Sequence, residues 1–150
     1  MSMSYIVFSN QHLVSVKDWQ ANLNKLGFAL TLDADGDHPI ATLIGHLPST
    51  WNKQEAGFEC YPGHATETAE AADTYDEFDF GGPWASMMEL YYSGFAGVAG
   101  AAMAAAAYAQ ATGGIVFEPE GGDIFDVETA ISHARETESW ASSMLAAEEP

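Results

Sequence analysis

The chain has 150 residues, of which 47% are hydrophobic, and its 22 acidic and 4 basic residues give a formal net charge of -18. This length and apolar content are typical of one domain that buries a core without disulfides or metals. The negative charge disfavours nucleic acid and anionic membranes as partners and attracts basic ones; the alternative is that it serves solubility alone. Cys60 is the only cysteine, and the first residues lack a secretory pattern, so the sequence predicts a cytoplasmic protein.

The first third of the chain predicts short strands around one helix. The apolar run at residues 5–8 indicates a buried strand, and apolar residues spaced by three and four predict a helix from Ser15 to Leu26 that ends at Gly27. Further strands are expected at residues 28–32, 40–45 and 57–61, with a loop at 47–51. The short connections favour antiparallel pairing between these strands.

Three aspartates at alternate positions follow the second predicted strand. Asp33, Asp35 and Asp37 match the first ligand positions of a calcium loop, but Gly36 and Ile44 occupy places where that loop needs other residues. The segment is therefore predicted to be a turn between strands. A metal site that combines His38 with Asp35 and Asp37 stays open as an alternative.

An acidic segment rich in alanine extends from residue 64 to 80. It predicts a solvent-facing helix or a partly ordered segment, because its acidic side chains have no basic partners one helical turn away. The carboxylates predicted to meet a basic partner are Glu67, Glu70, Asp73, Asp76, Glu77 and Asp79. Asp33, Asp35 and Asp37 are candidates for the same surface.

Residues 83–112 predict a long helix at the centre of the domain. No charged residue occurs from Leu90 to Thr112, so the helix has no face clearly made for water. Gly94, Gly97 and Gly100 destabilise a helix unless close packing compensates, and a bend or break is expected near Ser93 and Gly94. The stretch is mostly alanine and glycine with acidic flanks, which disfavours a membrane span. Its stripe of small residues also allows homo-oligomers.

The remainder predicts a strand at residues 115–117, a turn at 118–122, and a last helix capped by Asp126. Thr129, Ala130, Ala134 and Trp140 are available for packing, and residues 141–150 are expected to be a frayed tail. The predicted fold is a single α+β domain over residues 1–150. It has an antiparallel or mixed sheet of about five strands packed against the long, buried, Ala/Gly-rich helix.

The candidates for catalytic chemistry are a cysteine with a histidine and a single glutamate. Cys60 with His46 or His64 is the one thiol and imidazole pair, but the surrounding negative potential opposes a thiolate, so a buried strand thiol is predicted. Glu89 lies among apolar residues, and an inward orientation would raise its pKa and suit it to acid or base chemistry. On the surface of the helix, near its N-terminal half, Glu89 would only complement the helix dipole. No catalytic residue, metal ligand or cofactor is assigned.

Residues 104–130 combine an alanine-rich helix, the run Thr112-Gly113-Gly114-Ile115-Val116-Phe117-Glu118-Pro119 and the run Asp126-Val127-Glu128-Thr129-Ala130. This stretch resembles the C-terminal ends of small uncharacterised bacterial proteins, some of which are placed among the immunity proteins of polymorphic toxins. The resemblance carries no site residue and implies a bacterial interaction protein. We therefore expect an acidic, non-enzymatic binding protein, with an immunity or inhibitor role as its most concrete form. The alternative is a small enzyme or metal-dependent protein that uses Glu89 or the His38 region.

Overall fold

The computed structural model describes residues 3–148 and shows an α+β domain built on two antiparallel sheets. The strands of the larger sheet are β1 (Met3–Ser9), β3 (Gly45–Leu47), β6 (Phe58–His64), β7 (Ser86–Tyr92), β8 (Ile115–Glu118) and β9 (Asp123–Phe125). Their order is β3-β6-β7-β1-β8-β9. The smaller sheet has the order β2-β4-β5, with β2 (Leu30–Leu32), β4 (Ser49–Trp51) and β5 (Gln54–Glu55). The fold class predicted from the sequence is confirmed.

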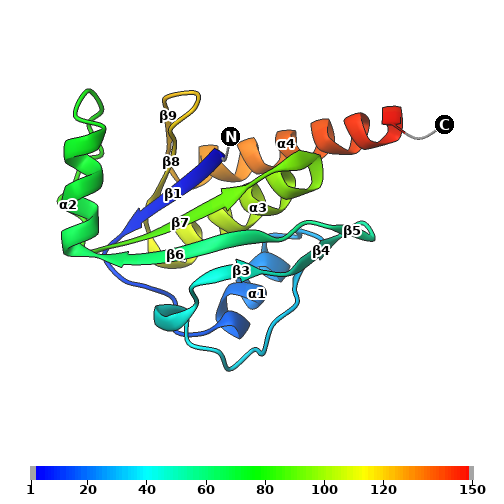
Figure 1. Ribbon diagram of the computed structural model, residues 1–150, viewed down its shortest axis with the longest axis horizontal. Helices are drawn as coiled ribbons and strands as arrows, with labels where there is room; N and C mark the ends of the chain where they lie inside the picture. Colours follow the sequence, from blue (N-terminus) through cyan, green and yellow to red (C-terminus); the bar gives the residue numbers. More distant parts are fainter. Residues whose placement is uncertain (1–2, 149–150) are drawn as a thin grey trace.

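The helices are α1 (Val16–Lys25), α2 (Ala65–Thr74), α3 (Gly94–Thr112) and α4 (Val127–Glu148), with a short 3-10 helix, η1 (Ile40–Thr42). Helix α3 lies along one face of the larger sheet and is covered by α1 and α4, whereas α2 projects from the far end of the sheet (Figure 1). Every residue of α3 from Ala99 to Ala109 is buried. The predicted burial of this helix is confirmed.

The first part of the predicted long helix is a strand. Residues 86–92 form β7, which pairs with β6 on one side and β1 on the other, and the helix begins only at Gly94. The expected break falls at Ser93 and Gly94, where the Gly94 φ angle is +76°. Helix prediction failed here because Met, Leu and Glu favour helices, and because Met87 and Tyr91 on the outer face leave β7 without a strict alternation of apolar and polar residues.

The two faces of the larger sheet carry separate apolar clusters. Tyr5, Val7, Met88 and Leu90 belong to the cluster that contains α3. The second cluster lies on the opposite face. It consists of Ile6 and Phe8 of β1, Met87 of β7 and Phe117 of β8, together with Phe80 from the segment that follows α2. The period of two along each strand therefore separates an inner face, against α3, from an outer face.

Three further segments differ from the prediction. Residues 40–45 form η1 and then the start of β3 instead of one strand, and residues 49–51 form β4 where a loop was expected. A third difference is β9, which pairs with β8 after the predicted turn. Strands β2 and β3 do not pair with each other, because β2 pairs with β4 and β3 with β6.

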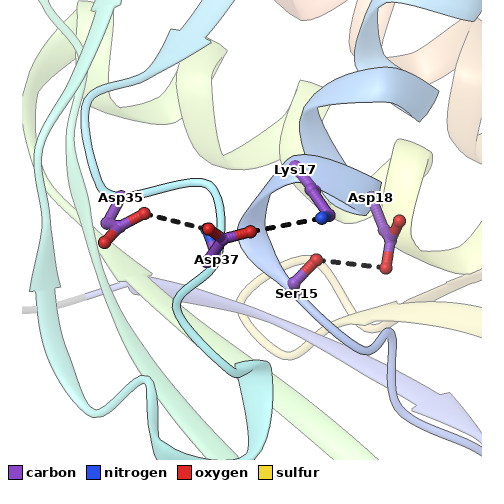
Figure 2. Close-up of polar contacts among 5 residues, drawn as sticks. All are labelled: Ser15, Lys17, Asp18, Asp35 and Asp37. Atoms are coloured by element: carbon purple, nitrogen blue, oxygen red, sulfur yellow. Dashed lines mark hydrogen bonds and ion pairs between the residues drawn. The ribbon is translucent and has the colours of Figure 1, made fainter.

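The first backbone amides of helix α1 donate to carbonyls of a loop and not to a capping side chain. The Lys17 amide donates to the Gly36 carbonyl over 2.9 Å, and the Val16 amide donates to the His38 carbonyl over 3.1 Å. The Ser15 hydroxyl donates to Asp18 at 3.2 Å, and the Lys17 ammonium contacts Asp37 at 3.2 Å (Figure 2). Backbone carbonyls thus satisfy amides that a capping residue usually satisfies.

Helix α4 begins as predicted and ends later than predicted. Asp126 caps it by accepting a hydrogen bond from the Thr129 amide over 2.8 Å. The helix continues to Glu148 where a frayed tail was expected from residue 141, and residues 149–150 lie outside the described part of the chain. Ala130 and Ala134 are buried as predicted, whereas Thr129 is exposed and Trp140 is 50% exposed.

A chain of hydrogen bonds fixes the segment between β1 and α1. The Leu13 amide donates to the Tyr108 hydroxyl over 3.3 Å, and this hydroxyl lies 2.8 Å from His12 Nδ1. His12 Nε2 lies 3.0 Å from the Gly63 carbonyl, which can only accept, so in the neutral ring Nε2 carries the proton and Nδ1 accepts from Tyr108. Protonation of Nδ1 would remove the acceptor that the Tyr108 hydroxyl uses.

We expect His12 to make folding stability sensitive to mild acid. Burial lowers the pKa of its imidazole below the ordinary value of 6.5, while the Gly63 carbonyl opposes that shift and His64 adds to it. A lowered pKa in the folded state means that His12 contributes its full stability above about pH 6.5 and loses it as the pH falls below that value. Urea unfolding of the wild type and of His12→Gln should therefore differ most near pH 7.5 and progressively less toward pH 5.5. A difference that stays constant or grows in acid would contradict this assignment.

Candidate functional site

Glutamates and tyrosines alternate on the outer face of strands β6 and β7. Glu59 and Tyr61 of β6 lie opposite Tyr91 and Glu89 of β7, respectively, so each carboxylate is paired across the strands with a phenol. The Tyr61 and Tyr91 rings meet edge to face with centroids 5.6 Å apart, and the Tyr61 hydroxyl donates to Glu59 over 3.1 Å. These four residues line one pocket of about 420 Å³.

Helix α2 lies beside this surface. Tyr61 and Glu89 also line an adjoining pocket of about 310 Å³, whose other side is formed by α2 and the residue that follows it. The side chains on that side include Glu67, Glu70 and Tyr75. We call the two pockets together the acidic groove.

The half-buried position of Glu89 makes the groove electrostatically unusual. Burial raises the pKa of the Glu89 carboxyl, Glu120 adds to the shift, and Tyr91 opposes it. Burial also raises the pKa of Tyr91 to about 12, with Glu89 as the next cause. The Glu89 shift indicates a carboxylate that is poorly solvated and is not neutralised by a neighbouring cation. A cation in the groove would stabilise its charge.

The basic residues of the chain lie elsewhere. Lys17 pairs with Asp37, and the Arg135 guanidinium donates to the Leu26 carbonyl and lies over the Phe28 ring. The other two are Lys25, at the end of α1, and Lys53, between β4 and β5, on the side of the molecule away from α2 (Figure 1). Within residues 3–148, none of the ion pairs involves a carboxylate that lines the acidic groove.

The structure divides the six carboxylates predicted to bind a partner. Glu67 and Glu70 line the acidic groove, whereas Asp73 and Asp79 line a different pocket between α2 and residues 78–84. The remaining two, Asp76 and Glu77, are exposed in the turn after α2. Glu67 also has a local role, because its carboxylate accepts a hydrogen bond from the His64 amide over 3.0 Å and so caps the helix.

The aspartates of the 33–37 loop do not join this surface. Asp35 accepts from the Asp37 amide over 3.0 Å, as in an ordinary turn, and Thr50 donates to Asp33 over 2.6 Å (Figure 2 shows Asp35 and Asp37). The loop lies beside α1, on the other side of the molecule from α2 (Figure 1). Among the residues that the structure describes, no three His, Cys, Asp or Glu side chains form a metal-binding group.

The proposed thiol and imidazole pair does not form. Cys60 is fully buried on the inner face of β6, and burial raises its pKa to about 12. His46 lies opposite Glu59, the neighbour of Cys60 in β6, so its side chain belongs to the outer face of the sheet. His64 is exposed at the end of β6. Cys60 is a buried strand thiol, as the sequence predicts.

The strand residues of the acidic groove were missed because they come from two strands, one of which was predicted to be helical. Glu89 is on β7 and half-buried, and it neither points into a helical core nor lies at a helix N-terminus. The signal in the sequence is a repeat of the pattern Glu-x-Tyr at residues 59–61 and 89–91. In two neighbouring strands, this pattern places all four side chains on one face.

Comparison of the chain with family models, with curated proteins and with solved structures returned no match. The resemblance to immunity proteins therefore stays a prediction. Among residues 3–148, no helix has both the length and the hydrophobicity to cross a membrane.

Proposed function

We propose that this protein is an acidic, non-enzymatic binding protein that docks a basic partner in the acidic groove. An immunity or inhibitor role, for example against a basic nuclease toxin, is the most concrete form of this proposal. The observation that carries it is the alternation of Glu59, Tyr61, Glu89 and Tyr91 beside the carboxylates of α2. Carboxylates attract a cation, and tyrosine faces stack on a planar guanidinium, so arginine side chains fit this surface best.

The partially buried carboxylate supports docking over mere solubility. A charged group kept only for solvation is normally exposed, whereas Glu89 is half-buried with its pKa raised. Removing it from water is unfavourable unless a bound partner supplies the opposite charge. The neighbouring tyrosines also favour docking. Their rings are held by the sheet, so they need little ordering when a partner binds.

The small-residue stripe of α3 packs against the protein's own chain. Its residues from Gly97 onward are buried, the Trp19 indole donates to the Ala104 carbonyl over 2.9 Å, and Gly100 faces Ala56. The proposed docking surface is therefore on the opposite side of the larger sheet from α3. The elements that carry it are β6, β7 and α2.

An octa-arginine peptide titrated into the protein at low ionic strength tests the proposal. We expect Glu59→Gln with Glu89→Gln to weaken binding about 10-fold, because each carboxylate contributes about 0.5–1 kcal/mol to a partly exposed ion pair. The double variant Glu128→Gln with Glu148→Gln removes the same net charge from exposed positions on α4 and should change the affinity less than about 2-fold. Octa-lysine should bind more weakly than octa-arginine, since it lacks the planar group.

Calorimetry measures the affinities, and amide chemical shifts locate the binding surface. Shifts centred on β6, β7 and α2 support docking in the acidic groove. Equal losses in the two double variants, or shifts spread evenly over the acidic residues, would mean that net charge alone attracts the peptide. Either result would overturn the proposed site.

A further inference from the structure

A further pocket, apart from the acidic groove, lies where the start of β1 meets α4. Figure 1 shows these two elements side by side. Its volume is about 430 Å³, within the range of small-molecule sites, and it shares no residue with the acidic groove. Its lining includes Tyr5, Tyr92, Phe95, Glu118, His133, Thr137 and Trp140. We call this the α4 pocket.

The walls of the α4 pocket are aromatic. The Tyr5 and Tyr92 rings are stacked with centroids 5.2 Å apart, and the Phe95 and Trp140 rings meet edge to face at 5.4 Å. Trp140 is 50% exposed at the rim, next to the 37% exposed Met3. Exposed large apolar side chains around a concave site are a usual mark of a surface that binds a ligand.

Polar groups converge within the aromatic walls. His133 Nε2 lies 2.8 Å from the Tyr5 hydroxyl, 3.4 Å from the Thr137 hydroxyl and 4.0 Å from Glu118 Oε2. The Phe125 ring stacks on the His133 ring with centroids 4.5 Å apart, which fixes the imidazole plane. His133, Thr137 and Trp140 come from one face of α4, because they are spaced by four and three residues.

The pocket holds a negative charge without a matching cation. The Glu118 side chain is only 20% exposed, and burial together with Asp123 and Glu120 raises its pKa. Its nearest basic group, His133, has a pKa lowered by burial despite the opposing charges of Glu136 and Asp123, so the imidazole is neutral at pH 7. Arg135 lies on another face of α4, where it contacts Leu26 and Phe28. A ligand would therefore supply the positive charge.

We propose that the α4 pocket binds a small organic ammonium ion with an aromatic or branched apolar body. The ammonium would face Glu118 and the Tyr5 hydroxyl, and the apolar body would lie against Tyr92, Phe95 and Trp140. Charge-assisted hydrogen bonds and contacts between a cation and aromatic faces both favour this class of ligand over an anion or a neutral molecule. This proposal is independent of the partner proposed for the acidic groove.

Three probes that share a phenylethyl body test the proposal. We expect phenethylammonium to bind with a dissociation constant on the order of 1 mM, and 2-phenylethanol and 3-phenylpropionate to bind at least about 10-fold more weakly. Binding is followed by the shift of the Trp140 indole N–H resonance, which is assigned by its loss in Trp140→Phe. No binding of phenethylammonium up to 10-fold above the expected constant would overturn the proposal.

Two variants test the roles within the site. Glu118→Gln keeps the shape of the side chain and should weaken phenethylammonium about 10-fold without changing 2-phenylethanol, whereas Glu128→Gln on exposed α4 should change neither. Trp140→Ala should weaken both probes, and because this variant lacks the indole, its binding is followed by the backbone amide shifts of α4. Equal binding of the ammonium and the carboxylate in the wild type, or an unchanged ammonium affinity in Glu118→Gln, would show that charge recognition by this pocket is absent.

Discussion

Trp19→Ala should lower the free energy of unfolding by about 4 kcal/mol, the largest effect that we expect from a single truncation in this protein. The Trp19 side chain is fully buried between α1 and α3, where its ring lies edge to face on Tyr108 at 5.2 Å and 6.0 Å from Phe58. Its indole also donates to the Ala104 carbonyl. Alanine would leave a large cavity and remove this hydrogen bond, and urea unfolding monitored by circular dichroism measures the loss.

Trp140→Ala is the matched control, because Trp140 is 50% exposed and its removal should cost less than about 1 kcal/mol. If Trp19→Ala unfolds too far for a reliable baseline, Trp19→Phe keeps an aromatic ring and should lose about 2 kcal/mol. Similar unfolding midpoints for Trp19→Ala and Trp140→Ala would show that the contact between α1 and α3 is not the stabilising contact that its burial implies.

The second large effect is expected at a glycine of α3. A methyl group on Gly100 would overlap the Ala56 carbonyl oxygen and lie 3.1 Å from the Ala56 Cβ atom, so backbone must move to admit it. Alanine gains about 1 kcal/mol over glycine in a helix, but overpacking against backbone should exceed this gain, for a net loss of about 3 kcal/mol. Thermal unfolding of Gly100→Ala measures the net change in stability from helix propensity and overpacking.

Gly97→Ala, one turn earlier in the same helix, is the control. Its added methyl group would meet the Tyr92 Cβ atom at 3.8 Å and the Gly57 carbonyl at 3.9 Å, which are ordinary contacts. Helix propensity should then act alone and raise stability by up to about 1 kcal/mol. If both variants change stability in the same direction, close approach is not the reason that α3 contains glycine at residue 100.

The sequence predicts α3 well because its signal is local. A run without charge over residues 90–112 requires burial wherever it lies in the fold, and Gly113, with φ at +71°, ends the helix as glycine commonly does. The cap at Asp126 is local in the same way. Strand β7 has no local signal, because its identity depends on pairing with β1 and β6, which are distant in the sequence.

The candidate site also combines residues with a local sequence signal and residues that only the tertiary structure brings together. The acidic residues of α2 are visible in the sequence as a charged segment, yet only the structure separates Glu67 and Glu70, which line the acidic groove, from Asp73 and Asp79. Glu59 and Glu89 become neighbours only through the register of β6 against β7. The α4 pocket likewise joins β1, β8 and α4, so none of these elements alone predicts it.

The position of β1 has a consequence for how the chain folds during synthesis. This first strand pairs with residues 86–92 and 115–117, and the hydrophobic residues Ile6, Val7 and Phe8 are buried only when those partners are present. A nascent chain that has not reached Ser86 therefore has neither flanking strand. The hydrophobic side chains of β1 stay exposed until those strands have been synthesised. Such long-range closure slows folding and gives aggregation-prone intermediates time to associate.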